Sequence, residues 1–180
     1  MLRTITIYGL VSGAVIALAI TIISVIGDVG SHGSGSLWLG YLIMLVALSA
    51  ILVGVKQYRD DVLGGVIGFG RALLVGLGIA VMAGIAYCAV WEVYLALTHY
   101  SFMDKYIADI LAAKRAAGVS AAEYQKAAAE METMRAQYAN PLYRVPMTFM
   151  EIFPVGVLIA LVSAALLRNS RFLPSRARAA

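Results

Sequence analysis

The sequence predicts an all-α integral membrane protein with four transmembrane helices and an extracytoplasmic amphipathic helical hairpin between the third and the fourth. Three observations predict this fold. Of the 180 residues, 62% are hydrophobic and only 13% are charged, whereas a typical soluble domain is about 25% charged. Four apolar runs approach the ~20 residues that cross a ~30 Å hydrocarbon core. A more polar, helix-forming segment, residues 99–140, separates the last two runs.

The four predicted spans cover about residues 5–26, 37–55, 68–97 and 145–167. The apolar part of the fourth, Ile152–Leu167, is short, so the residues from Val145 must supply its first turns and Glu151 falls inside the span. Arg3 followed by an apolar run also fits the start of a signal peptide. The run is too long for one and lacks a small-x-small cleavage site, so we expect a retained helix and one membrane domain over residues 1–180.

The distribution of basic residues predicts the orientation. They precede the first span, follow the second and fourth, and begin the third: Arg3, Lys56, Arg59, Arg71, Arg168, Arg171, Arg176 and Arg178. The positive-inside rule then places both termini in the cytoplasm. Topology explains the net charge of +4 better than nucleic-acid binding does. We expect membrane lipid as a partner, with Arg71, Arg168 and Arg171 near head groups, and the mixed-charge stretch KQYRDD (56–61) as a solvated turn.

The segment 99–140 reads as two helices with apolar stripes. Gly118 ends the first helix, and Ser120 with Glu123 forms an S-x-x-E capping box for the second, which Asn140-Pro141 ends. The stripes recur at helical spacing: Phe102, Met103, Tyr106, Ile107, Ile110 and Leu111, then Tyr124, Ala127, Met131, Met134 and Tyr138. They either pack on each other or on the bilayer, or they form a groove for a partner or ligand.

Four polar residues near the outer ends of the last two spans form a candidate intramembrane cluster: Glu92, His99, Arg144 and Glu151. Glu92 lies either at the interface or more than one turn deep. Arg144 stands seven residues before Glu151, and His99 seven after Glu92, so each carboxylate has a candidate partner on its own helix. The two carboxylates can also approach each other. Such a cluster relays protons, binds a lipid head group or locks the helices together.

Small residues and one proline predict helix packing. Gly9 and Gly13, followed by Ala17, form one small-xxx-small row, and Gly76, Ala80 and Gly84 form another. Such rows let transmembrane backbones approach closely, so we expect these faces to pack on each other or in a homo-oligomer. Pro154 removes a backbone donor and should kink the fourth helix.

Several phrases together resemble a known family. They include YGLVSG (8–13), GYLIMLVALSAILVGVKQYRD (40–60), GGVIGFGRALLVGLGIA (64–80), WEVY (91–94), FMDKY (102–106) and NPLYRVPMTFMEIFPVGVLIALVSAALL (140–167). They are similar to a bacterial integral membrane family catalogued as domain of unknown function 4199. The resemblance implies a small multi-pass protein of the bacterial cytoplasmic (inner) membrane, and it implies no substrate or catalytic residue.

The sequence predicts no reaction. The one cysteine, Cys88, lies in an apolar run, and no zinc-protease, nucleophile-elbow or paired CxxC motif occurs. We therefore expect no metal, no cofactor and no catalytic residue. The leading hypothesis is a non-enzymatic accessory or scaffold protein that acts through the hairpin and the glycine-lined faces, with a membrane-protein partner or a second copy. The alternative is a small oligomeric transporter or lipid-handling protein centred on Glu92 and Glu151, and the third is an intramembrane enzyme.

Overall fold

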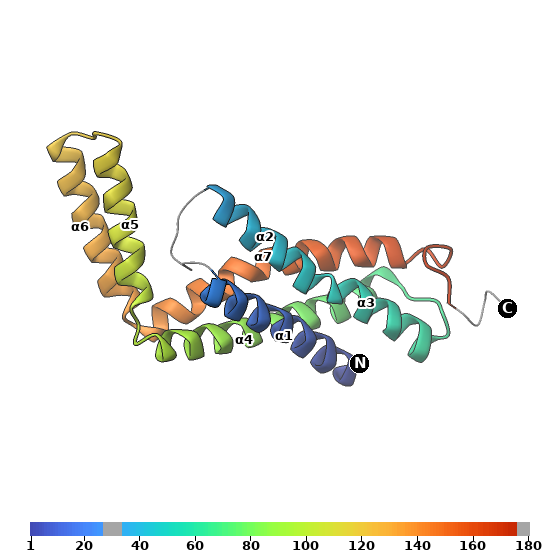
Figure 1. The fold of residues 1–180 in the computed structure, drawn as a ribbon. Coiled ribbons are helices and arrows are strands. Elements are labelled where there is room, and N and C mark those ends of the chain that lie inside the picture. Colours follow the sequence, from blue (N-terminus) through green and yellow to red (C-terminus); the bar gives the residue numbers. More distant parts are fainter. Residues whose placement is uncertain (27–33, 176–180) are drawn as a thin grey trace.

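The computed structural model describes residues 1–26 and 34–175, and over these ranges the chain is helical without strands. Four helical stretches are long and apolar enough to span a membrane: Leu2–Ile22, Gly40–Val62, Phe69–Leu97 and Pro141–Leu167. They lie side by side as a bundle, and a hairpin of two further helices projects from one end of it (Figure 1). The predicted all-α fold, with four candidate spans and a helical hairpin between the third and the fourth, is confirmed. Most of the first predicted loop, at residues 27–33, lies outside the described residues.

Helix α4 (Phe69–Leu97) is the centre of the bundle, with α1 (Leu2–Ile26) and α7 (Pro141–Leu167) packed along it. Gly9 of α1 faces Met82, and Gly13 faces Ala86, so α1 and α4 run parallel. The second predicted row serves another contact, because Gly76 faces Ala160 of the antiparallel α7. The two glycine rows therefore do not pack on each other. Each lets α4 approach a different neighbour, and the gain is dispersion contact between closely packed helices.

The second span consists of three pieces. Helix α2 (Ser34–Leu48) ends at Ser49, α3 (Ala50–Gln57) continues it, and a π-helical turn, η1 (Tyr58–Val62), completes it. The Ser49 hydroxyl donates to the Val46 carbonyl at 2.6 Å, and such local side-chain bonds compete with regular helix hydrogen bonds and bend helices. The span thus runs through the charged stretch that we expected to form a turn.

That expectation was wrong for Arg59 in particular, whose side chain is fully buried. Its Nε donates to Asp60 Oδ1 at 2.7 Å, its Nη1 to the Phe172 carbonyl at 2.9 Å, and its Nη2 to the Leu173 carbonyl. The segment after α7 turns back and covers this arginine. We call the end of the bundle with Arg59 and Phe172 the terminal end, because α1 begins and α7 ends there (Figure 1).

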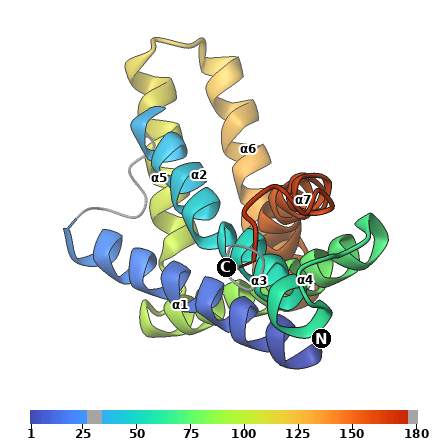
Figure 2. The same ribbon diagram turned by 90° about the vertical axis from the view of Figure 1, so that its right-hand side faces the viewer.

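The hairpin consists of α5 (Phe102–Ala116) and α6 (Ala121–Tyr138) and rises across the bundle axis (Figures 1 and 2). Gly118, with φ +68°, makes the turn, and the predicted capping box of Ser120 and Glu123 is confirmed. The apolar stripes pack on each other and on the end of α4, around the buried residues Leu95, Met103, Ile107 and Tyr138. The hairpin therefore has a small core of its own that is continuous with α4.

Helix α7 leads from the hairpin back through the bundle. Asn140 caps it, since its side chain accepts from the Leu142 amide at 3.0 Å, and Pro141 occupies the first turn, where its missing N–H costs nothing. Pro146 and Pro154 both lie inside the helix, and its axis changes direction partway along (Figure 1). An internal proline removes one backbone hydrogen bond and bends a helix in this way.

Candidate functional site

Arg144, in the first turns of α7, fastens the hairpin to the bundle. Its side chain is only 3% exposed. The guanidinium donates from Nε to Glu92 Oε1 and from Nη2 to Glu92 Oε2, both at 2.7 Å, and from Nη1 to the Tyr138 carbonyl at 2.9 Å. This fork-to-fork pairing is the strong, geometrically specific form of an arginine–carboxylate contact. One side chain thereby joins α4, the end of α6 and the start of α7. We call this set of contacts the Arg144 latch.

Aromatic rings surround the Arg144 latch. The guanidinium carbon lies 5.3 Å from the centre of the Tyr100 ring and 5.6 Å from that of Tyr138, within the range of cation–π attraction. The Trp91 indole donates to the Tyr138 hydroxyl at 2.7 Å. Burial raises the pKa of Tyr138 above its ordinary value, so its phenol stays protonated and uncharged at neutral pH. The latch is a polar network closed by neutral aromatic groups.

The structure divides the four residues of the predicted cluster. Glu92 and Arg144 pair across two helices, although the sequence offered Arg144 as a partner for Glu151. His99 lies beyond the end of α4 with an exposed side chain and a left-handed backbone, φ 51°, because α4 stops before it reaches that position. Glu151 lies along α7, where it accepts a hydrogen bond from the Tyr87 hydroxyl at 3.2 Å. The carboxylates therefore have separate partners.

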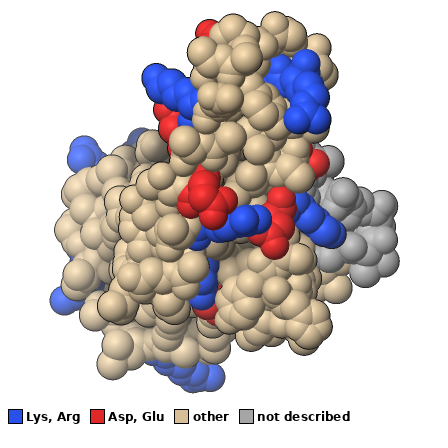
Figure 3. Space-filling model, turned by 90° about the vertical axis from the view of Figure 1, so that its left-hand side faces the viewer, with Lys and Arg blue, Asp and Glu red and all other residues tan. Residues whose placement is uncertain are grey.

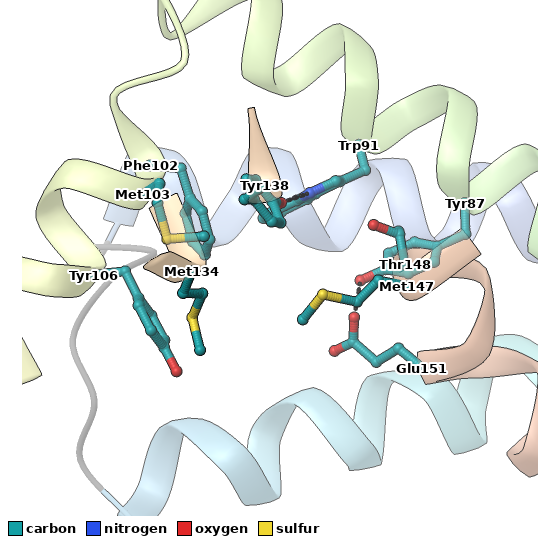
Figure 4. A pocket seen from close by; sticks show the side chains of 10 residues that line it. All are labelled: Tyr87, Trp91, Phe102, Met103, Tyr106, Met134, Tyr138, Met147, Thr148 and Glu151. Carbon is teal, nitrogen blue, oxygen red and sulfur yellow. Dashed lines mark hydrogen bonds between the residues drawn. The ribbon is translucent and has the colours of Figure 1, made fainter. Parts of the chain in front are cut away.

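Glu151 lines a cavity of about 260 Å³ in the corner between the hairpin and the bundle. Hairpin residues stand on one side of it, Met147, Thr148 and Glu151 on the other, and Tyr138 and Trp91 between them (Figure 4). Ten residues from four helices form the lining: Tyr87, Trp91, Phe102, Met103, Tyr106, Met134, Tyr138, Met147, Thr148 and Glu151. The cavity is thus walled mainly by rings and thioethers and has a carboxylate at one side.

Charged side chains gather where the hairpin meets the bundle. Figure 3, which views the molecule from the hairpin end, shows acidic and basic groups side by side across the middle of this face. Arg135 of α6 bonds Asp104 of α5 and also lies 3.4 Å from Glu132. These exposed pairs add little stability each. The pair with Asp104 joins α6 to α5, whereas the pair with Glu132 lies within α6.

The predicted lipid-contact arginines lie away from this site. Arg71, Arg168 and Arg171 are exposed near the terminal end.

The other members of the predicted packing row also contact α7. Ala80 faces Gly156 of α7, and Gly84 faces the Phe149 ring. Among the described residues, no group of three or more histidine, cysteine or acidic side chains could hold a metal ion.

Sequence reasoning missed the residues that complete the site. Tyr87 and Trp91 read as ordinary members of an apolar run, yet one donates to Glu151 and the other to Tyr138. A signal was present: Tyr87, Trp91 and Tyr94 recur at helical spacing, which predicts an aromatic face on one side of α4. The cavity itself depends on the angle at which the hairpin leaves the bundle, and no local pattern encodes that angle.

Comparisons with known proteins give a family but no activity. The family model described as "Protein of unknown function (DUF4199)" matches residues 7–169. No curated protein and no solved structure matches the chain.

Proposed function

We propose, from the premise that the chain belongs to the DUF4199 family of proteins of unknown function, that it is a non-enzymatic multi-pass membrane protein that presents its helical hairpin as a rigid platform for a partner. It would act as an accessory or scaffold protein. The observation that carries the proposal is the Arg144 latch, because three helices meet in one buried arginine. A hairpin held this way keeps a fixed direction relative to the membrane.

The two faces of the hairpin support the same proposal. Its apolar stripes face its own core, the end of α4 and the cavity, which leaves a polar outer surface. Helix α6 lies farther from the bundle than α5 (Figure 1) and exposes Glu123, Lys126, Glu130 and Glu132. A mixed-charge, immobile surface suits a protein partner, since electrostatic complementarity gives specificity.

We further propose that the chain resides in the bacterial cytoplasmic membrane, with both termini in the cytoplasm and the hairpin outside. The basic residues of the terminal end support this topology, because Lys56, Arg59, Arg71, Arg168 and Arg171 lie there, whereas Arg144 at the hairpin end is paired with Glu92. Reporter fusions at the two ends and at Gly118 test it. Reporters at the ends should signal from the cytoplasm and the one at Gly118 from the opposite side.

Site-specific photo-crosslinking in intact cells tests the platform. A photoreactive side chain replaces Glu130 on the outer face of α6, and the matched control replaces Leu18, which is 62% exposed on a membrane-spanning helix. We expect a discrete protein adduct from position 130 that disappears when Lys126 is changed to Glu, and no such adduct from position 18. A folded protein that gives no adduct from the outer face of α6 would contradict the proposal.

A second function is favoured by one observation, the Glu151 carboxylate in the cavity beneath the hairpin. A carboxylate in a membrane-spanning segment is costly and is a functional candidate by default. It supports a small transporter or lipid-handling protein, which would need several copies because four spans enclose little space. Glu151→Gln in a membrane-flux or lipid-exchange assay tests it, and unchanged activity relative to Glu130→Gln would exclude it.

A further inference from the structure

We propose that the cavity between the hairpin and the bundle binds the ammonium group of an amphiphilic organic cation, with Glu151 as its counter-charge and aromatic rings as its wall. The binding step stands independently of the scaffold function. Its biological use rests on the second function proposed above.

Charge selects a cation. Of the ten described residues that line the cavity, Glu151 is the one acid and none is basic. Arg144, which lies over the Tyr138 ring, has its guanidinium committed to Glu92 and to the Tyr138 carbonyl. Glu151 itself accepts one hydrogen bond, from the neutral Tyr87 hydroxyl. A cation in the cavity would lie beside this carboxylate, and a nearby opposite charge favours the ionised form of a carboxyl group.

The walls select an organic cation over a metal ion. Five of the ten lining residues are aromatic and three are methionines. The faces of aromatic rings attract ammonium groups, and quaternary ammonium ions are bound in cages of such rings. A calcium or magnesium ion requires six or more oxygen ligands, whereas this lining offers oxygens mainly from Glu151, Thr148 and tyrosine hydroxyls. Thioethers and rings instead accommodate methyl or methylene groups.

The volume limits how much of the ligand enters. The cavity holds about 260 Å³, slightly less than the ~300–1,000 Å³ typical of sites that enclose a whole small molecule. A head group with a short apolar portion therefore fits, and the rest of an amphiphile extends outside. The cavity lies at the corner where the hairpin leaves the bundle. It is lined by Trp91, which stacks on Tyr94, and both ring types gather at membrane–water interfaces. The ligand is thus either an amine-bearing lipid head group or a free amphiphilic amine.

Trp91 supplies a direct readout of binding. The chain has two tryptophans, and Trp38 is 77% exposed and outside the lining. Full-length Trp38→Phe protein in neutral detergent therefore reports from Trp91 alone. We expect choline to change its fluorescence saturably, and the neutral analogue in which carbon replaces the choline nitrogen to bind at least tenfold more weakly. Equal binding of the two probes would overturn the proposal.

Glu151→Gln in the same background keeps the side-chain shape and removes the charge. We expect at least a tenfold loss of choline affinity, with Asp61→Asn, an exposed position at the terminal end, as the unchanged control. If the Gln variant does not fold, Glu151→Asp keeps the charge and should retain saturable, charge-selective binding. Full choline affinity in a folded Glu151→Gln protein would exclude the site.

Bilayer composition then distinguishes the two sources of the cation. The protein is placed in nanodiscs of phosphatidylglycerol alone or with phosphatidylethanolamine, and choline is titrated into each. Competition by phosphatidylethanolamine that Glu151→Gln abolishes assigns the site to a lipid head group, and unaltered choline binding in both discs assigns it to free amphiphilic amines. Competition that is the same with and without Glu151 would overturn the proposal. Crosslinking from position 130 is a separate measurement. If the protein with Glu151 intact binds no choline while it still captures its partner, this inference is overturned and the scaffold proposal stands.

Discussion

Helix α7 is fastened near both of its ends by a buried arginine, and the two fastenings are built differently. At the hairpin end, Arg144 reaches across to Glu92 on α4, 52 residues away in sequence, and to the chain just before α7. At the terminal end, Arg59 pairs with its neighbour Asp60 and binds the carbonyls of Phe172 and Leu173, just after α7. We call the second set of contacts the Arg59 latch.

The two latches differ in whether the carboxylate has a second cationic partner besides its arginine. Asp60 also pairs with Lys56, whose Nζ lies 2.5 Å from Oδ2. Glu92 has both of its oxygens on Arg144. Breaking a buried pair from one side is costly because it leaves an uncompensated charge. The Arg144 latch is therefore the more fragile, although Arg59 is the more completely buried of the two arginines.

Arg144→Met should cause the largest loss in the free energy of unfolding. It leaves the Glu92 carboxylate without its cation and the Tyr138 carbonyl without its donor, and we expect a loss of about 3 kcal/mol in the free energy of unfolding, at the lower end for a buried pair because Glu92 is 31% exposed. Denaturation in mixed micelles measures it. The double variant with Glu92→Gln should recover part of the loss, and a double variant that is no better than the single one would show that Glu92 is not the partner that matters.

Gly156→Leu disrupts the packing of the middle of α7 on α4 and leaves both latches intact. A Cβ at this position would lie 2.9 Å from the Ala80 Cβ, so α7 must shift away from α4 at a cost of about 1–3 kcal/mol. Gly40→Leu is the matched control, because nothing lies within 4 Å of its Cβ position. The same denaturation assay compares them, and equal stability of the two variants would mean that α4 and α7 are not closely packed.

Arg59→Met should cost less, about 1–2 kcal/mol, because Asp60 keeps Lys56 and the freed carbonyls can bind water. Its clearest signature is local. The exposed Arg171 precedes the carbonyls that Arg59 holds, so trypsin should cut there faster once the segment is released. Lys56→Met serves as the control that removes a nearby charge and keeps the latch. Identical cleavage rates in all three proteins would contradict the role of Arg59.

The same comparison shows what the sequence could predict. Counting apolar residues was enough for the fold class, because hydrocarbon thickness fixes helix length. The strong local signals at Gly118, Ser120 and Asn140 were likewise enough for the hairpin. Glu92 and Arg144 were recognisable as costly residues in apolar surroundings. Their pairing was not, since it depends on the register of two antiparallel helices that are distant in sequence.

Arg59 was beyond prediction for another reason. A run of mixed charges after an apolar segment is usually solvated, and KQYRDD has that composition. What buries Arg59 is a π-helical turn and the return of the segment after α7, and neither leaves a local pattern. Glu151 stands between these cases. The free-energy cost of placing its carboxylate among apolar residues was evident from the sequence. Its contact with Tyr87 and the cavity depend on the arrangement of four helices and could not be predicted.

Backbone strain beside the two latches gives the smallest and most selective test. His99 and Tyr100 have φ of 51° and 57° next to the Arg144 latch, and Leu173, which Arg59 binds, has φ 47°. This conformation costs a non-glycine residue about 1–2 kcal/mol, and surrounding contacts must offset that cost.

His99→Gly should therefore stabilise the protein by roughly 0.5 kcal/mol, since glycine relieves the strain but adds unfolded-state entropy. Tyr100→Gly relieves the same strain but loses the ring over Arg144, so thermal denaturation should rank it below His99→Gly. Thr98→Gly, at φ −94°, has no strain to relieve and should destabilise. If His99→Gly destabilised as much as Thr98→Gly, the left-handed turn would not be what the latch holds in place.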